Sequence, residues 1–196
     1  MRKLIFVLGG AGAGKTTVAK AFAAARGAAF FDMDTLLRPA AAAIMSQAGL
    51  DPEDRDSAEY KRLCRDLGYR ITMDAALENI AIGTDALVVG PFTKETKDRY
   101  WLERELSSIG ASPETVDVKV IIVHLQDELM YRQRIEARGS ALDKWKLENW
   151  ETFRHSLAPR KIEWNIDAAS ILFYDNSAVM SDHDLARLER FVYGES

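Results

Sequence analysis

Five short apolar runs recur along the chain, and each one predicts a buried β-strand. The runs are rich in Val, Ile, Leu and Phe and show little alternation with polar residues, as expected for strands that are covered on both faces. Longer segments of helical or polar character separate each run from the next. The predicted strands comprise residues 3–8, 28–31, 85–90, 118–125 and 170–174.

Apolar residues at helical spacing fill most of the segments between the predicted strands. The first helix is expected directly after the first strand, over residues 15–26, and Gly27 suits its carboxyl cap. Ser181 and Asp184 have the spacing of a capping box, which predicts the start of the last helix. A further helix ends at Gly139, and others are predicted over residues 36–49, 57–82, 101–109 and 147–157.

This alternation predicts an α/β fold in which residues 1–196 form one domain. Right-handed crossovers between parallel strands place helices on both faces of the sheet, which gives three layers. The helical segment at about 36–82 is longer than a crossover needs, so we expect it to cover a substrate or to be a structural elaboration. The helix–loop–helix at about 139–160 has the pattern of a lid, with residues 140–146 as a flexible connector.

The turn after the first strand carries the most specific motif of the chain. Gly9, Gly14, Lys15 and Thr16 match the pattern G-x-x-x-x-G-K-[ST]. Glycines let the backbone amides turn inward around phosphate groups, and the following helix adds the partial positive charge of its N-terminus. We therefore predict a nucleotide-binding loop, in which Lys15 reaches the phosphates and Thr16 binds Mg²⁺. The residues expected to contact the nucleotide are Gly9, Gly10, Ala11, Gly12, Ala13, Gly14, Lys15, Thr16 and Thr17.

Two carboxylates follow the second predicted strand. Asp32 and Asp34 lie at its carboxyl end, and in open α/β sheets ligands bind at that edge. Asp34 also suits the N-cap of the next helix, a role that Thr35 could share, so capping is the alternative to a functional role. Arg38, which follows on the same helix, is the arginine of this segment that is best placed to face the site.

Two arginines define a second candidate group. Arg134 and Arg138 are four residues apart and therefore lie on one face of a helix. Guanidinium groups in such a pair suit the binding of a planar base and of a phosphate, whereas ordinary solvated arginines are the alternative interpretation. The turn at residues 175–177, after the fifth strand, could border the base.

Composition narrows the class of protein. A hydrophobic share of 47% with 29% charged residues is that of a globular domain, and a net charge of −4 argues against a general nucleic-acid or membrane-surface binder. Cys64 is the single cysteine, so no disulfide within the chain can form. No apolar run is long enough for a membrane span, and the first apolar run leads into the phosphate loop rather than a cleavage site. We expect a cytoplasmic protein.

Together the phosphate loop, Asp32 and Asp34, the R-x-x-x-R-G of residues 134–139 and the lid resemble the adenylate-kinase-like group of P-loop kinases. Within that group the chain resembles shikimate kinase, gluconate kinase, chloramphenicol phosphotransferase and the zeta-toxin and polynucleotide-kinase types. The resemblance implies a three-layer P-loop NTPase fold with a five-stranded parallel sheet of order 2-3-1-4-5. It also implies an ATP-dependent kinase that uses Mg²⁺.

By position, the resemblance assigns roles to the candidate residues. Lys15 would stabilise the transferring phosphoryl group, Thr16 would hold Mg²⁺, and Asp32 would lie in the outer shell of the metal. Asp34 would orient or deprotonate the acceptor hydroxyl, and Arg38 would face the acceptor. Arg134 resembles the arginine that packs on adenine, and Arg138 resembles the one that bridges phosphates.

The acceptor is the least defined part of this prediction. Gly90-Pro91-Phe92 stands where shikimate kinase has a glycine-rich strand end, and the third strand lacks a Walker B aspartate. A small metabolite, an antibiotic or a nucleoside stay open as acceptors, with a nucleic-acid end less favoured. The alternative function is a nucleotide hydrolase that acts as a switch or assembly factor. The pattern fits a monomer or a homodimer equally.

Overall fold

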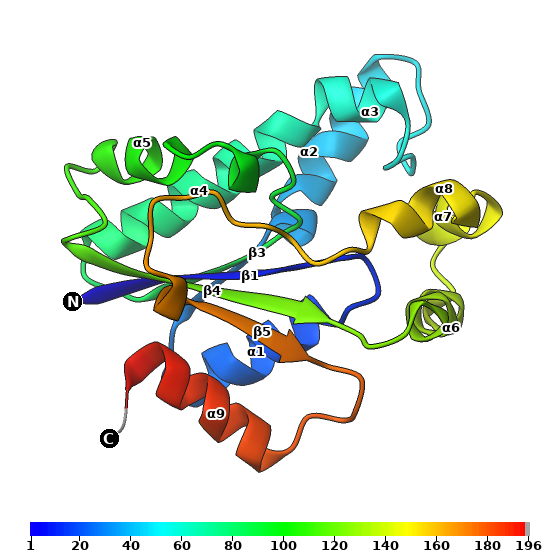
Figure 1. Ribbon diagram of the computed structural model, residues 1–196. Coiled ribbons are helices and arrows are strands. Elements are labelled where there is room, and N and C mark those ends of the chain that lie inside the picture. The colour runs from blue at the N-terminus through cyan, green and yellow to red at the C-terminus, as the bar shows by residue number, and fades with distance from the viewer. Residues whose placement is uncertain (195–196) are drawn as a thin grey trace.

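A five-stranded parallel sheet lies between two layers of helices in the computed structural model, which describes residues 1–194 (Figure 1). The strand order is β2-β3-β1-β4-β5, which confirms the expected order. Every neighbouring pair is parallel, so the carboxyl ends of the strands lie along one edge. The strands are β1 Arg2–Gly9, β2 Ala29–Asp32, β3 Ala86–Val89, β4 Val116–His124 and β5 Ile171–Asp175.

Helices cover both faces of the sheet and crowd around its carboxyl edge. In Figure 1, α1 and α9 lie on one face, α4 and α5 lie on the other, and α6, α7 and α8 lie beyond the carboxyl edge. No helix in the described residues combines the length and apolar content needed to cross a bilayer. The helices are α1 Lys15–Arg26, α2 Met33–Gln47, α3 Ala58–Leu63, α4 Arg65–Ala81, α5 Trp101–Ser107, α6 Glu128–Arg138, α7 Lys144–Glu148, α8 Trp150–Phe153 and α9 Asp182–Tyr193.

An aromatic cluster fills the core on the face covered by α4 and α5. The ring of Phe6, on the central strand β1, lies 5.4 Å from the ring of Phe92 and 4.8 Å from that of Trp164. Trp164 belongs to the segment between α8 and β5, and its indole N–H donates to the carbonyl oxygen of Glu95 at 2.8 Å. This packing fixes the chain that returns from the lid across the sheet.

On the opposite face of the sheet, the predicted lid packs against the core. Val18 and Phe22 from α1 pack in the same buried cluster as Ile135 from α6 and Trp150 and Phe153 from α8. The apolar face expected over residues 147–157 is therefore largely buried, but its helix is broken. Asn149 has φ −116° and ψ 38°, which ends α7 and lets α8 turn against α6.

Two expectations about local structure are corrected. The second helix begins at Met33 rather than at residue 36, because Asp32 caps it. The segment 140–146, expected as a flexible connector, forms a 3₁₀ turn over Ala141–Asp143 and the start of α7. Ion pairs of Asp143 and Lys146 account for this order, and a pattern of polar residues along the sequence does not reveal them.

The aromatic cluster gives a direct test of the core. We expect Phe6→Ala to lower the free energy of unfolding by about 3–5 kcal/mol, because it leaves a cavity in a fully buried cluster. Phe173→Ala, on the exposed face of edge strand β5, should cost less than about 1 kcal/mol and serves as the control. Urea denaturation followed by circular dichroism measures both. Equal losses in the two variants would contradict the assignment of the core.

Candidate active site

The phosphate loop joins β1 to α1, and a distant turn braces it. Gly14 has φ 89°, and a Cβ at this position would lie 2.3 Å from the side-chain nitrogen of Asn176. That nitrogen donates a hydrogen bond of 2.8 Å to the carbonyl oxygen of Ala13. Only glycine meets both demands at position 14, so the turn after β5 helps to define the shape of the loop.

The interior of the loop is suited to an anion. Among residues 1–194, the amide groups of Gly12, Gly14 and Lys15 donate no hydrogen bond to the protein. They precede or open α1, where the helix dipole adds partial positive charge. The Lys15 ammonium group donates to the carbonyl oxygen of Gly10 at 3.0 Å, so the side chain lies across the loop. The donors present therefore fit the phosphate groups of a nucleotide.

Asp32 connects the phosphate loop to the second helix. One of its oxygens accepts a hydrogen bond of 2.8 Å from the Thr16 hydroxyl. The other accepts from the amides of Asp34 at 3.0 Å and Thr35 at 3.3 Å, which caps α2. The cap is therefore Asp32, and the capping roles considered for Asp34 and Thr35 are wrong. The carboxylate of Asp34 is left exposed in the first turn of α2.

Thr16 and Asp32 are also the pair that suits a hydrated Mg²⁺. Mg²⁺ in nucleotide sites usually keeps several waters and binds few protein ligands besides the phosphates. In the part of the chain that the structure describes, no cluster of three or more His, Cys, Asp or Glu side chains could hold a metal alone. A hydroxyl backed by a buried carboxylate is the donor set that such a partly hydrated ion requires.

Lys15 is the electrostatic centre of the site. Burial lowers the pKa of its ammonium group to about 8, while the nearby carboxylates of Asp34 and Asp32 act in the opposite direction. Arg160 and Arg138 lower the pKa further because they place like charges nearby. The fold thus brings five charged side chains together from α1, the start of α2, α6 and the segment after the lid.

The predicted arginines have different surroundings. Arg134 donates to the carbonyl oxygens of Asn176 at 2.7 Å and Ser177 at 3.3 Å, in the turn that also braces the phosphate loop. Arg138 donates through Nε to Asp143 at 2.7 Å. Arg38 lies exposed on α2, one turn after Asp34, and makes no hydrogen bond or ion pair within residues 1–194.

Arg160 is a site residue that the sequence did not reveal. Its Nε atom is buried and has no hydrogen-bond partner, the one such side-chain atom in the described part of the chain. Burial also lowers the pKa of its guanidinium group. It directly follows Pro159, where the predicted lid ends, and nothing in its sequence neighbourhood separates it from an ordinary surface arginine. An unpaired buried donor beside Lys15 indicates a place for an anionic ligand.

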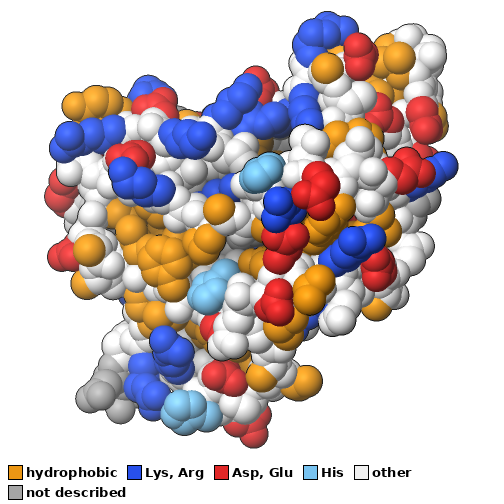
Figure 2. Space-filling model, turned by 45° about the vertical axis from the view of Figure 1, so that its right-hand side comes forward, with side chains coloured by type: hydrophobic (Ala, Val, Ile, Leu, Met, Phe, Trp, Pro, Cys, Tyr) orange, Lys and Arg blue, Asp and Glu red, His pale blue; other side chains and the backbone are white. Residues whose placement is uncertain are grey.

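A cavity of about 760 Å³ opens beside Arg160. In the face of the molecule shown in Figure 2, Lys and Arg side chains gather across the upper part, above a hydrophobic area. The Arg65–Glu95 ion pair, at 3.1 Å, holds the loop after β3 at this cavity because Arg65 also donates to Thr93. The residues that line the cavity are Thr93, Thr96, Lys97, Arg99, Ala158, Pro159, Arg160, Lys161, Glu163, Trp164, Asn165 and Ile166.

Comparison with known proteins finds relatives by structure only. No protein-family model matches the chain, and no curated protein matches it. A sugar kinase from Janibacter sp. HTCC2649 is 16% identical with a TM-score of 0.61, and the match covers 99% of this chain and 96% of that one. A gluconokinase from Sinorhizobium meliloti 1021 is 19% identical with a TM-score of 0.54, over 98% of both chains.

A third solved structure has a higher TM-score. A protein of Chloroflexus aurantiacus j-10-fl, described as a candidate kinase, is 15% identical with a TM-score of 0.67, over 96% of this chain and 94% of that one. At these identities the comparisons show the fold. The chain has the three-layer α/β fold of P-loop small-molecule kinases, which confirms the resemblance at the level of the fold.

The lowered pKa of Lys15 makes anion binding depend on pH. Above pH 8 we expect the dissociation constant of Mg·ADP to rise towards tenfold per pH unit, because free Lys15 loses its proton near pH 8. Bound phosphate restores the charge, so binding at pH 8.5 should take up protons. Calorimetry in buffers of different ionisation enthalpy measures this uptake. Proton uptake that persists in Lys15→Met would contradict the assignment.

The same pKa shift affects stability without a ligand. The pKa of Lys15 is about 8 in the folded chain and 10.5 for a free lysine, so the unfolded chain binds more protons between these values. The contribution of Lys15 to the free energy of unfolding should therefore increase as pH rises from about 8 to 10.5. Comparison of the free energies of unfolding of wild type and Lys15→Met over this range isolates that contribution. If the ammonium group were ion-paired, the contribution should have the opposite sign.

Arg160 should stabilise a ligand rather than the fold. We expect Arg160→Met to keep or raise the melting temperature, because it removes a buried donor without a partner. Binding of Mg·AMP-PNP, a γ-phosphate analogue, or of an anionic acceptor should weaken about tenfold or more. Arg187→Met, an exposed arginine on α9, is the control. Loss of stability with unchanged binding would assign Arg160 a structural role instead.

Proposed function

We propose that this chain is an ATP-dependent kinase that transfers the γ-phosphoryl group of Mg·ATP to a hydroxyl group of a small-molecule acceptor. The observation that carries this proposal is the grouping around Lys15 of two carboxylates and two arginines, beside a braced phosphate loop. Phosphoryl transfer requires mainly positioning and neutralisation of charge, and this grouping supplies both.

Each side chain then has a defined task. Lys15 and the free amides of the loop bind the phosphates, while Arg138 and Arg160 neutralise the charge that develops on the transferring group. Asp34, freed from capping, orients the acceptor hydroxyl and accepts its proton. A bound Mg²⁺ would supply charge neutralisation between phosphate oxygens, and Thr16 with Asp32 would hold it.

The remaining predicted residues lie around this centre. Arg134, held by the turn after β5, borders the base of the nucleotide, and Arg38 faces the acceptor from α2. The lid at about 139–160 excludes water, and the helical segment at about 36–82 covers the acceptor. A kinase that depends on ATP works where ATP is abundant, which is consistent with the expected cytoplasmic location. Monomer and homodimer remain equally compatible with the proposal.

The cavity beside Arg160 favours an acceptor that carries an anionic group. Lys97, Arg99, Arg160 and Lys161 line it together with one carboxylate, Glu163. Lys161 pairs with Glu163 at 2.6 Å, so three cationic side chains are left for a ligand. Hydroxy acids and sugar phosphates match this charge better than neutral antibiotics or nucleosides do.

A phosphoryl-transfer screen tests the proposal. Protein with γ-labelled Mg·ATP is offered pooled hydroxy acids, sugar phosphates, nucleosides, antibiotics and 5′-hydroxyl oligonucleotides. We expect a labelled acceptor whose formation falls at least about a thousandfold in Lys15→Ala, because the charge on the phosphates is no longer offset. Asp34→Asn should lower kcat roughly a hundredfold or more while nucleotide affinity stays within about twofold.

Asp182→Asn, an exposed acid at the start of α9, is the matched control and should leave transfer unchanged. Release of free phosphate without a labelled acceptor, increased by a partner protein, would favour a nucleotide-driven switch. Undiminished transfer in Asp34→Asn would remove the proton-accepting role from that residue.

A further inference from the structure

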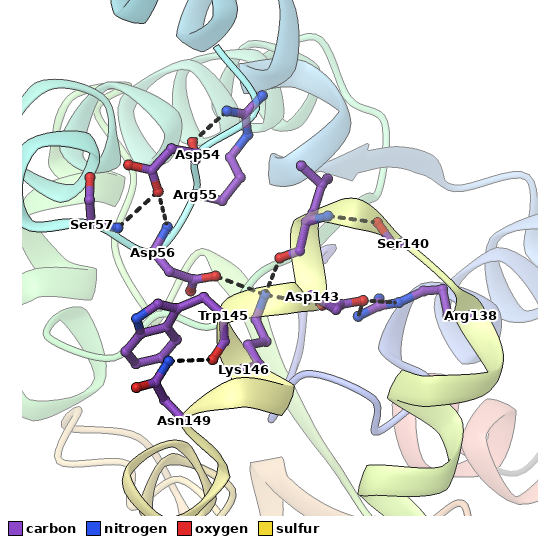
Figure 3. A network of polar contacts seen from close by, with 11 residues as sticks. Asp54, Arg55, Asp56, Ser57, Arg138, Ser140, Asp143, Trp145, Lys146 and Asn149 are labelled. Atoms are coloured by element: carbon purple, nitrogen blue, oxygen red, sulfur yellow. Dashed lines mark hydrogen bonds and ion pairs between the residues drawn. The ribbon is translucent and has the colours of Figure 1, made fainter. Parts of the chain in front are cut away.

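A continuous chain of ion pairs runs from α6 through the predicted lid to the loop that precedes α3. Arg138 donates to one oxygen of Asp143 at 2.7 Å, and Lys146 contacts the other oxygen at 3.1 Å. The Lys146 ammonium group also lies 3.2 Å from a carboxylate oxygen of Asp56 and donates to the carbonyl oxygen of Leu142 at 3.0 Å. Figure 3 shows these side chains converging between the lid and the loop before α3.

The central pair of this chain is enclosed, unlike the Lys144–Glu148 pair in the same helix. The side chains of Asp143 and Lys146 are 3% and 13% exposed, whereas Lys144 and Glu148, which pair along the same helix, are 78% and 60% exposed. A buried carboxylate is tolerated only where partners offset its lost hydration. Asp143 has a cation on each oxygen, so it depends on both Arg138 and Lys146.

The far end of the chain is fixed beside the proposed acceptor site. Asp54 accepts hydrogen bonds from the amides of Asp56 at 2.9 Å and Ser57 at 3.0 Å, which holds the loop in one shape. Burial raises the pKa of the Tyr60 hydroxyl, in the next helix, to about 12, and the charges of Asp34 and Asp56 act in the same direction. Asp56 and Asp34 therefore both act on the hydroxyl of Tyr60.

A second contact joins the same two regions. The Lys61 ammonium group of α3 lies 5.8 Å from the centre of the Trp145 ring in α7. Trp145 directly precedes Lys146 in the sequence, and Lys61 lies in the helix that follows Asp56. The lid thus rests on the segment at 36–82 through an ion pair and a cation–π contact, both of them close to the charged chain.

Arg138 needs a counter-charge to remain at the site. It lies close enough to Lys15 for the two cations to repel each other when no phosphate is bound. A half-exposed arginine also has many rotamers to populate. Asp143 is the carboxylate that offsets this repulsion and restricts those rotamers, and Lys146 holds Asp143 in turn.

We propose that Asp143 and Lys146 are positioning residues, which aim Arg138 at the transferring phosphate only while the lid rests on the Asp56 loop. This proposal depends on the proposed function, because it assumes that Arg138 contacts the γ-phosphate. Its consequence is that an open lid withdraws the arginine, so phosphoryl transfer to water is slow until the lid and the acceptor region are joined.

Nucleotide discrimination provides the test, since it needs no acceptor. The ratio of the dissociation constants of Mg·ADP and Mg·AMP-PNP reports contact with the γ-phosphate. We expect Arg138→Met to lower this preference about tenfold, which corresponds to about 1.4 kcal/mol. Asp143→Asn should lower it nearly as far, and the double variant should be no worse than Arg138→Met alone, because both changes remove one interaction. Lys144→Met is the matched control in the same helix.

The lid contact is tested by hydrogen exchange of residues 142–156. Lys146→Met and Asp56→Asn should speed exchange there several-fold while α1 stays protected, and Lys146→Arg should restore most of the protection. Asp56→Asn leaves the ion pair between Asp143 and Arg138 intact. This variant should therefore reduce the nucleotide preference less than Asp143→Asn does. Thermal unfolding without nucleotide checks that each variant is folded.

The outcomes separate the two proposals. A wild-type protein that binds neither nucleotide overturns both the kinase assignment and the positioning role. If wild type discriminates and Arg138→Met does not, the site assignment stands. In that case additive losses in the double variant, or an unchanged ratio in folded Asp143→Asn, overturn only the positioning role of the ion pairs.

Discussion

The ammonium group of Lys15 is partly withdrawn from water at the carboxyl edge of the sheet, and most of the site follows from that single constraint. Burial makes the charge costly, as its lowered pKa shows. Two carboxylates reduce the cost and two arginines increase it, so the site favours an anion. The parallel register makes this possible, because it brings the ends of β1 and β2 to the same edge. Charge that is unfavourable in the free protein becomes favourable once phosphate is bound.

The sequence predicted the parts of this arrangement that local physics determines. All five strands, the phosphate loop and the capping box at Ser181 could be read from patterns of a few residues, whereas the strand order followed from the resemblance to P-loop kinases. Asp34 and Thr35 suit an N-cap by sequence, whereas Asp32 caps α2 in the structure. The end of β2 directs Asp32 at Thr16, and this direction distinguishes the role of Asp32 from that of Asp34.

Contacts between residues far apart in the chain could not be predicted from the sequence. Arg160 follows the lid without any periodic signal, and its proximity to Lys15 depends on Trp164, which anchors that segment in the aromatic cluster. Polar residues in the segment 140–146 suggested a flexible connector, yet two of them are among the less exposed ionic side chains of the chain. Polar residues in a sequence indicate exposure to water only where the fold brings no oppositely charged partner near them. The acceptor-facing region is therefore the part least accessible to sequence reasoning.

The brace between Asn176 and Ala13 has a consequence for how the protein is made. Residues 9–16 leave the ribosome early, but the side chain that holds their loop in shape, Asn176, directly follows β5 near the end of the chain. Domains fold as their segments emerge during synthesis. A nascent chain that has completed β1 to β4 therefore carries the phosphate motif without the finished cradle. On the proposed function, the nucleotide cradle is therefore complete only when the turn after the fifth strand has been added.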